Sequence, residues 1–292
     1  MPVRRAFDIT SQTTVTPIVV NSWQTLTLNP IRVPCLELAE SIAEHMMLTL
    51  FGGTPVIMTA WKDKRLRGIP HPDQAITDQL EDILERQIGL PGRTPRAINP
   101  NQGRYAGQEK LDHLEGFVAE HLWHLATTHQ IYGGPYHRVN PISFRVTDSG
   151  ADGFVIFEPT PGQYHYRLWE IKKNSTGRNP RPTAVDACVQ LAKNATYYLQ
   201  ELSKVGEHES DATLKTFYSN IVFHWRRQHP EANAGVALVV DQGRAGRNPF
   251  DMLGSVHLTA LAGQDRLHGL QIEVQDVRKL AEDVRTVIWS GL

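Results

Sequence analysis

Two short runs of apolar, aromatic and β-branched residues, interleaved with polar ones, occupy the middle of the chain. These runs are Asp152–Glu158 and Tyr164–Lys172, and the Pro/Gly cluster Pro159–Gly162 separates them. The pattern predicts two antiparallel strands joined by a tight turn. A turn centred on Pro161 would set Ile156 opposite Tyr166, Phe154 opposite Leu168 and Asp152 opposite Glu170.

Apolar residues recur at helical or strand spacing in most of the remaining chain. The helices that this spacing predicts are Glu37–Leu50, one beginning at Pro72 and Asp73, Gln108–Gln130, one capped by Thr183 and ending at Leu202, Asp211–Gln228 and Asp276–Trp289. The further strands are Thr14–Val20, Trp23–Leu28, Pro55–Trp61, Gly235–Asp241 and Leu270–Val274, with Lys62–Arg67 as a basic loop. This content predicts an α/β fold.

The stretch Leu90–Gly107 is rich in Pro, Gly, Asn and Arg and is the best candidate for a domain boundary. We therefore expect an N-terminal α+β region at 1–105 and a second domain at 106–292. The N-terminal region carries no motif with a chemical meaning, so a role in target recognition or partner docking is its expected contribution.

Composition places the chain among ordinary globular proteins, with 40% hydrophobic and 21% charged residues. The formal net charge of -1 provides no global attraction to nucleic acid, so any contact with DNA has to come from local patches. Two distant cysteines, Cys35 and Cys188, favour a reducing compartment over a disulfide framework. No apolar run is long enough to cross a membrane, and we expect a cytoplasmic protein.

The hairpin register brings two carboxylates and a lysine together. Directly opposed residues have Cβ atoms about 4.5–5.5 Å apart, so Asp152 and Glu170 would repel each other without a positive charge nearby. Lys172 lies two residues beyond Glu170 and shares its face of the strand. A divalent cation would remove the repulsion, and a set of oxygen ligands suits Mg²⁺ better than Zn²⁺. An exposed ion pair between Glu170 and Lys172 would explain the same residues without any metal.

Asp152 followed by Glu170-Ile171-Lys172 on the next strand resembles the core of the PD-(D/E)xK nuclease superfamily. The proline of that signature is absent, because Ala151 precedes Asp152. The resemblance implies a restriction-endonuclease-like fold, in which a mixed sheet is flanked by helices. It also implies that Asp152 and Glu170 bind Mg²⁺, for which Mn²⁺ would substitute, and that Lys172 assists the attacking water.

The resemblance also requires an acidic residue on the helix before the hairpin, and two carboxylates compete for this role. Glu115 lies near the border of the apolar stripe of Gln108–Gln130, whereas Glu120 follows a run of small and apolar residues similar to that of the family. We favour Glu120, with Glu115 as the alternative metal ligand. Four histidines occur in the same segment, and without a zinc-binding spacing we interpret them as border and surface residues: His113, His121, His124 and His129.

Basic and polar residues around the hairpin are candidates for contacts with a nucleic acid. Those expected to lie beside the metal or on flexible loops are Arg178, Arg181, Gln190, Lys193, Arg244 and Arg247. For Gln190 and Lys193, a solvated helix face explains their positions equally well.

Together these features predict a Mg²⁺-dependent endonuclease that hydrolyses DNA. The resemblance further suggests a role in bacterial restriction or anti-phage defence, with a helicase or another defence protein as partner and a possible homo-oligomer. The alternative is a catalytically inactive subunit of a larger complex that binds nucleic acid or acts as a scaffold.

Overall fold

A continuous mixed sheet forms the centre of the molecule in the computed structural model, which describes residues 14–20, 23–70, 73–87, 90, 105–128, 136–139, 152–175, 179–242, 249–253, 258, 261 and 265–292. Within these residues seven strands lie in the spatial order β1-β2-β7-β6-β5-β4-β3. Their bounds are β1 Thr14–Val20, β2 Trp23–Ile31, β3 Tyr136–Val139, β4 Gly153–Thr160, β5 Gln163–Asn174, β6 Ala232–Asp241 and β7 Leu267–Val274. Strands β2, β7, β6 and β5 run parallel to their neighbours in that series, while β1, β4 and β3 extend it through antiparallel pairings.

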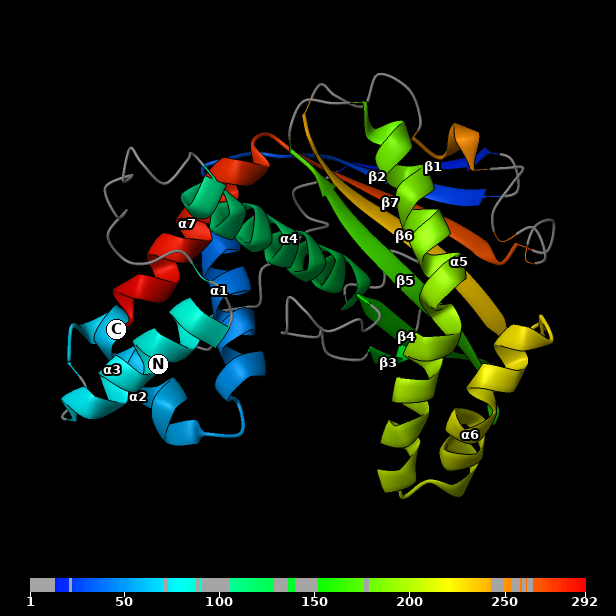
Figure 1. Ribbon diagram of the computed structural model, residues 1–292, viewed down its shortest axis with the longest axis horizontal. Helices are drawn as coiled ribbons and strands as arrows, with labels where there is room; N and C mark the ends of the chain where they lie inside the picture. Colours follow the sequence, from blue (N-terminus) through cyan, green and yellow to red (C-terminus); the bar gives the residue numbers. More distant parts are fainter. Residues whose placement is uncertain are drawn as a thin grey trace.

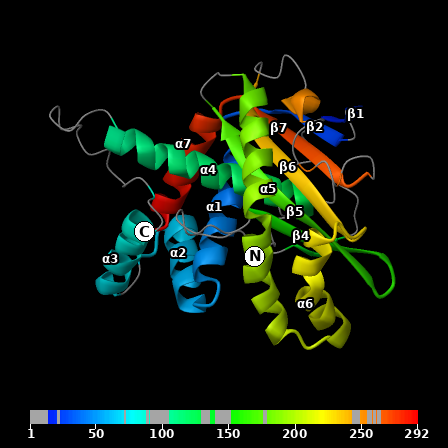
Figure 2. The same ribbon diagram turned by 45° about the vertical axis from the view of Figure 1, so that its right-hand side comes forward.

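Helices cover both faces of the sheet, which makes the fold α/β as predicted (Figure 1). One face carries α1 Leu36–Phe51, α4 Tyr105–Thr128 and α7 Val277–Ser290, with α2 Pro55–Arg67 and α3 Gln74–Asp82 packed outside them. The opposite face carries α5 Pro180–Val205 and α6 Ala212–Arg226, as the rotated view also shows (Figure 2). Shorter helical turns are η2 Ile83–Gln87, η3 Gly206–His208 and η4 Pro249–Met252. None of the helices in the described ranges is long and apolar enough to cross a membrane.

Alternation along β5 divides the core into two parts. Tyr166 and Leu168 belong to the hydrophobic cluster beneath α5 and α6, whereas Trp169 and Ile171 belong to the cluster beneath α1, α4 and α7. Successive side chains of a strand point to opposite faces, so one strand contributes to both clusters. β6 is buried along nearly its whole length, which confirms the prediction of a strand covered on both faces.

The two predicted strands are confirmed, and so are two of the three predicted pairs, whereas Asp152 precedes β4 and forms no ladder pair with Glu170. Phe154 pairs with Leu168 and Ile156 pairs with Tyr166. The turn between β4 and β5 consists of Pro161 and Gly162, and Gly162 adopts a φ of +79°, a conformation that glycine reaches without the steric cost borne by other residues. The position of every side chain along β5 relative to the two faces follows from this register.

The prediction of a strand at Pro55–Trp61 is wrong, because this segment forms the first half of α2. A short apolar run does not distinguish a strand from a helix by periodicity alone. Here Pro55 occupies the first helical turn, where proline is well tolerated, and the buried Trp61 donates a hydrogen bond from Nε1 to the Ile288 carbonyl oxygen at 2.9 Å.

The basic residues Lys62–Arg67 are therefore helical and do not form a loop. Their ion pairs join α2 to α1: Lys62 pairs with Glu44, and Arg65 lies 2.6 Å from Glu40. These two ion pairs give Lys62 and Arg65 a structural role.

Helix α5 begins one turn earlier than predicted. Asn179, rather than Thr183, caps it by accepting a hydrogen bond from the Arg181 amide at 3.1 Å. Thr183 Oγ1 instead accepts a hydrogen bond from Asn174 Nδ2 at 3.0 Å, which ties the end of β5 to the first turn of α5.

The N-terminal strands extend the same sheet as the strands beyond residue 105. β2 pairs in parallel with β7, and α1 packs against α7. The division into 1–105 and 106–292 stays a prediction, and the two portions share one hydrophobic cluster.

Two tryptophans fill the space between α4 and the sheet, and two glycines make room for them. The rings of Trp123 and Trp169 lie 5.9 Å apart between centroids. A Cβ on Gly153 would lie 2.3 Å from the Trp123 ring, and one on Gly235 would lie 2.4 Å from the Trp169 ring. Both glycines are therefore required for the close approach of an indole to the backbone.

Candidate active site

The two strands of the hairpin separate at one end, and the candidate site lies there. The last pair of the β4–β5 ladder is Gly153 with Trp169, whereas β5 continues to Asn174 paired with β6 on its other side. Asp152 occupies the resulting gap, because its Oδ2 accepts a hydrogen bond from the Ile171 amide at 2.8 Å. A side-chain carboxylate thus binds a backbone donor at the edge of β5 that β4 does not reach.

Glu170 and Lys172 project from the same face of β5 beside Asp152. The Glu170 side chain is fully buried, and the Lys172 Nζ lies 2.6 Å from Glu170 Oε1 and 3.9 Å from Asp152 Oδ2. The three residues that the register predicted to converge are therefore in contact. Only about a third of the Lys172 side chain is exposed, so its ammonium lies at the entrance to the buried carboxylates.

Burial and mutual repulsion raise the pKa values of the carboxyl groups. Burial, followed by the Asp152 charge, raises the pKa of Glu170 to about 8, against the opposing effect of Lys172. Burial also raises the pKa of Asp152, while Lys172 and the Ile171 amide lower it. For Lys172 itself, burial lowers the pKa, but the two carboxylates together outweigh this and leave it raised. Lys172 is accordingly a permanent cation at neutral pH.

Helix α4 supplies a further carboxylate, and the structure places Glu120 rather than Glu115 beside the hairpin group. Burial raises the pKa of Glu120 well above its usual value, and the charges of Asp152 and Glu170 raise it further. Glu115 points elsewhere: its Oε2 lies 2.6 Å from Lys173 Nζ and accepts a hydrogen bond from Ser175. Lys173 lies on the opposite face of β5 from Lys172, so the contact of Glu115 is separate from the group around Glu170.

The charges of this group fit a divalent cation. Three carboxylates and one ammonium leave two negative charges when all are ionised, in a place where burial penalises charge. The donors are all oxygen atoms, the ligands that Mg²⁺ prefers. Glu120, Asp152 and Glu170 are therefore suited to hold such an ion, whereas Glu115 already has a cationic partner.

Replacing each of the two helical glutamates with glutamine is expected to separate their roles. If the group performs the Mg²⁺-dependent DNA cleavage that the sequence predicts, Glu120→Gln should lower that cleavage by about two orders of magnitude or more, because it removes a charge that would face the cation. Glu115→Gln should retain cleavage within a few-fold and lower thermal stability, because it weakens the contact with Lys173. Cleavage rates and melting temperatures of both variants check this. Equal loss of cleavage in the two variants would contradict the assignment of Glu120.

A row of polar residues on α5 borders the group. Asn194 Nδ2 donates a hydrogen bond to the Tyr198 hydroxyl at 3.2 Å, and Gln190 also hydrogen-bonds this hydroxyl. Burial raises the pKa of Tyr198, and the charges of Glu170 and Asp152 raise it further. Gln190 is thus half-buried at the site, while Lys193 on the same helix is exposed. Gln190 and Tyr198 are eight residues apart on α5, with Asn194 midway between them.

Of the arginines predicted to contact phosphate, Arg178, Arg244 and Arg247 lie outside the described residues. Arg181 is half-buried in the first turn of α5, where the end of β5 is tied to that helix. Its placement near the end of β5 keeps it a candidate for a phosphate contact.

The interpretation of the α4 histidines as border and surface residues is wrong for His121. His121 is fully buried, and its ring lies 5.0 Å from that of His45 on α1, which in turn stacks on His124 at 4.2 Å. Burial lowers the pKa of His121 to about 3 and that of His124 to about 4, so both are neutral at physiological pH. The apolar pattern of α4 did not reveal the burial of His121, because this burial comes from α1, which packs against α4. His113 is half-buried, and His129 lies outside the described residues.

No protein-family model and no curated protein matches this chain. By its fold the chain is an α/β protein. Its candidate site consists of carboxylates around the buried Glu170, together with one lysine.

Proposed function

We propose that this protein is a metal-dependent endonuclease that hydrolyses phosphodiester bonds of DNA. The observation that carries the proposal is the meeting of Glu120, Asp152, Glu170 and Lys172 where β4 and β5 separate. One fully buried and two half-buried carboxylates with one ammonium are costly unless a cation joins them, and a divalent ion held by such ligands supports phosphodiester hydrolysis.

The order of the elements supports a restriction-endonuclease-like fold. An acidic helix, α4, precedes the β4–β5 hairpin, and α5 follows it and packs across the sheet. This is the order that the resemblance to the PD-(D/E)xK superfamily implies. Glu120 lies on α4, Glu170 and Lys172 lie on β5, and Asp152 directly precedes β4, which supports the proposal.

Each residue of the group has a role in this proposal. Glu120, Asp152 and Glu170 would hold Mg²⁺ or Mn²⁺, and the bound ion would polarise the phosphoryl oxygen and lower the pKa of a coordinated water. Without a bound ion, the charges of Asp152 and Glu170 raise the pKa of Lys172, which favours the protonated form over a general base. It acts instead as a fixed positive charge and donor that orients the attacking water and stabilises the negative charge developing on the phosphate.

Other parts of the proposal rest on the resemblance alone. They are a role in bacterial restriction or anti-phage defence, a helicase or other defence protein as partner, a homo-oligomer and a cytoplasmic location. DNA is favoured over RNA on the same basis.

The experiment that tests the proposal uses neighbouring lysines as a matched pair. Purified wild type, Lys172→Gln and Lys173→Gln are incubated with supercoiled plasmid and single-stranded DNA in Mg²⁺, Mn²⁺ or EDTA. We expect metal-dependent cutting by the wild type, a loss of about 10²–10⁴-fold in Lys172→Gln and near-normal cutting in Lys173→Gln, whose side chain binds Asp112 and Glu115 instead.

Two results would point away from an endonuclease. Salt-sensitive DNA binding that is indifferent to Mg²⁺ and to Lys172→Gln, without cutting, would identify an inactive nucleic-acid-binding subunit. Absence of both cutting and binding would leave the Glu170–Lys172 contact as a structural ion pair.

A further inference from the structure

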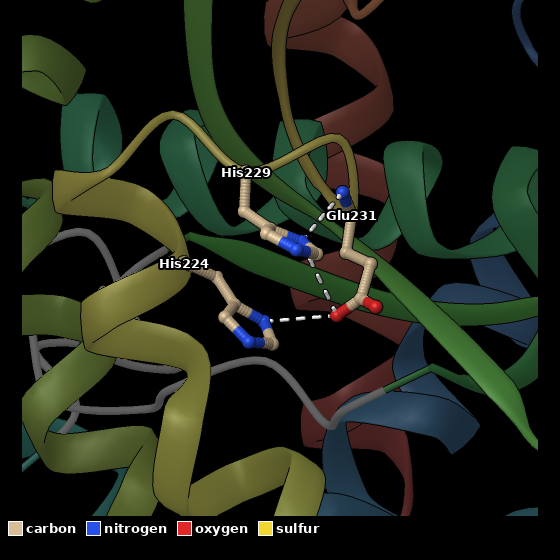
Figure 3. Close-up of side chains that lie close together, drawn as sticks. All are labelled: His224, His229 and Glu231. Carbon is tan, nitrogen blue, oxygen red and sulfur yellow. Dashed lines mark hydrogen bonds and ion pairs between the residues drawn. The ribbon is translucent and has the colours of Figure 1, made fainter.

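A second cluster of titratable side chains lies at the other end of β5, where α6 leads into β6. His224 comes from the last turn of α6, His229 from the connecting turn and Glu231 from the residue before β6 (Figure 3). Among the described residues this is the group whose histidine nitrogens and carboxylate oxygen all lie within 4.8 Å of one another. The sequence contains one signal for this cluster. A histidine near the end of a predicted helix is followed five residues later by a second histidine, and a glutamate comes two residues after that.

Both histidine side chains lie close to one carboxylate oxygen of Glu231. The Nδ1 atom of His224 lies 2.9 Å from Glu231 Oε2, and the Nδ1 atom of His229 lies 3.7 Å from the same oxygen. The two imidazole rings are stacked, with centroids 4.5 Å apart and planes 20° apart. Figure 3 shows the Nδ1 atom of His224 beside the Glu231 carboxylate and the Nδ1 atom of His229 between that carboxylate and the Glu231 backbone amide, from which it accepts a long hydrogen bond of 3.5 Å. The two nitrogens and the oxygen therefore lie close enough together to share one ion.

The backbone holds this arrangement in place. The His229 amide donates to the His224 carbonyl at 2.8 Å, and the intervening Gln228 adopts a positive φ of 56°. Arg266, the residue before β7, donates from Nη1 to the carbonyl oxygens of Gln228 at 2.9 Å and His229 at 2.7 Å. A buried guanidinium thus fixes a turn that brings His229 over His224, and the ligand geometry is set before any ion binds.

The spacing of the three atoms suits a transition metal. Zinc binds histidine nitrogen at about 2.0–2.1 Å, and tetrahedral geometry then separates neighbouring ligand atoms by about 3.4 Å. The observed contacts of 2.9 Å and 3.7 Å with Glu231 Oε2 bracket this separation. Imidazole nitrogens favour Zn²⁺ and similar ions over Mg²⁺, so the cluster differs in chemistry from the all-oxygen group around Glu170.

We propose that His224, His229 and Glu231 form a binding site for Zn²⁺ or a related divalent transition metal. Three protein ligands leave one position for water or another ligand, and the exposed ring of His229 keeps the site open to solvent. The bound ion ties the end of α6 to the start of β6. This inference is independent of the proposed endonuclease activity.

Zinc binding by the full chain tests the site directly. Protein stripped of metal with EDTA and dialysed is titrated calorimetrically with ZnCl₂, with and without millimolar Mg²⁺, so that any zinc bound by the carboxylate group is detected. We expect one zinc ion per chain at this site, a loss of affinity of at least about tenfold in each of His224→Gln, His229→Gln and Glu231→Gln, and a zinc-dependent rise in melting temperature of the wild type that these variants lack.

His137→Gln is the matched control, because His137 also faces a glutamate, Glu158, at 3.6 Å but belongs to no metal-holding group within the described part of the chain. It should bind zinc as the wild type does. His229 is exposed, so its variant remains informative even if His224→Gln fails to fold. The proposal is overturned if the wild type binds no zinc at micromolar concentration, or if His229→Gln and Glu231→Gln bind it unchanged. It is also overturned if His137→Gln weakens binding as much as they do.

Discussion

Glu170→Gln is expected to abolish DNA cleavage and, at pH 8 without metal, to raise the melting temperature of the protein. The two effects have one cause. Glu170 is fully buried next to Asp152, and its ionised form is costly until a cation binds. Loss of about 4 kcal/mol of metal-based transition-state stabilisation would slow cleavage about a thousandfold.

The direction of the stability change follows from the pKa of Glu170. The pKa rises from a usual value of 4.5 to about 8 in the folded protein, so between these pH values the folded state binds more protons than the unfolded state. The contribution of Glu170 to stability is therefore largest below pH 4.5 and is lost as pH rises through 8. Glutamine has no such dependence.

Thermal unfolding of wild type and Glu170→Gln in EDTA, from pH 5 to pH 9, measures this difference. The two curves should lie close together at pH 5 and separate toward pH 8, with the variant more stable. Mg²⁺ at a hundred times its dissociation constant should stabilise the wild type by about 2.7 kcal/mol and leave the variant unchanged. A variant that is less stable than the wild type at pH 8 in EDTA would show that the ion pair with Lys172 outweighs the burial cost.

Trp169→Ala should lower the free energy of unfolding by about 3–5 kcal/mol. The indole is buried between Trp123 and the backbone at Gly235, and its removal leaves a cavity that these rigid neighbours cannot fill. Urea denaturation measures the loss. Tyr197→Ala serves as a control, because this aromatic side chain on α5 is about half exposed and should contribute less than about 0.5 kcal/mol.

A double-mutant cycle tests the contact that explains this loss. Gly235→Ala should cost about 1–3 kcal/mol in the wild type, since its Cβ would lie 2.4 Å from the Trp169 ring. In the Trp169→Ala background the same substitution should cost much less, because the obstructing ring is gone. Additive effects of the two changes would show that Gly235 is required for a reason other than the indole.

The sequence determined the hairpin well because its information is local. The turn at Pro161-Gly162 and the alternation along both strands set the register, and the register brings Asp152, Glu170 and Lys172 together. The choice between Glu115 and Glu120 needed the tertiary structure. Five residues correspond to a rotation of about 140° on a helix, so only the way α4 lies on β5 decides which glutamate faces the hairpin group.

Other features escaped sequence reasoning because they depend on partners far away in the chain. His121 is buried by α1, whose residue His45 lies against it, and no pattern within α4 contains that contact. The apolar run Pro55–Trp61 became helical where Trp61 meets the carbonyl of Ile288, near the other end of the chain.

The two-residue turn between β4 and β5 has a consequence for how this protein can change over time. Lys172 and Lys173 are adjacent in sequence but contact different acidic groups on opposite faces of β5. A length change in the turn that shifted β5 by one residue would exchange those faces and move Lys172 away from the carboxylates. Surface loops generally accept insertions and deletions. Here, however, the length of a turn about ten residues from the candidate site decides which lysine side chain lies beside Asp152 and Glu170. Loop length, and not only side-chain identity, is therefore under chemical constraint at this turn.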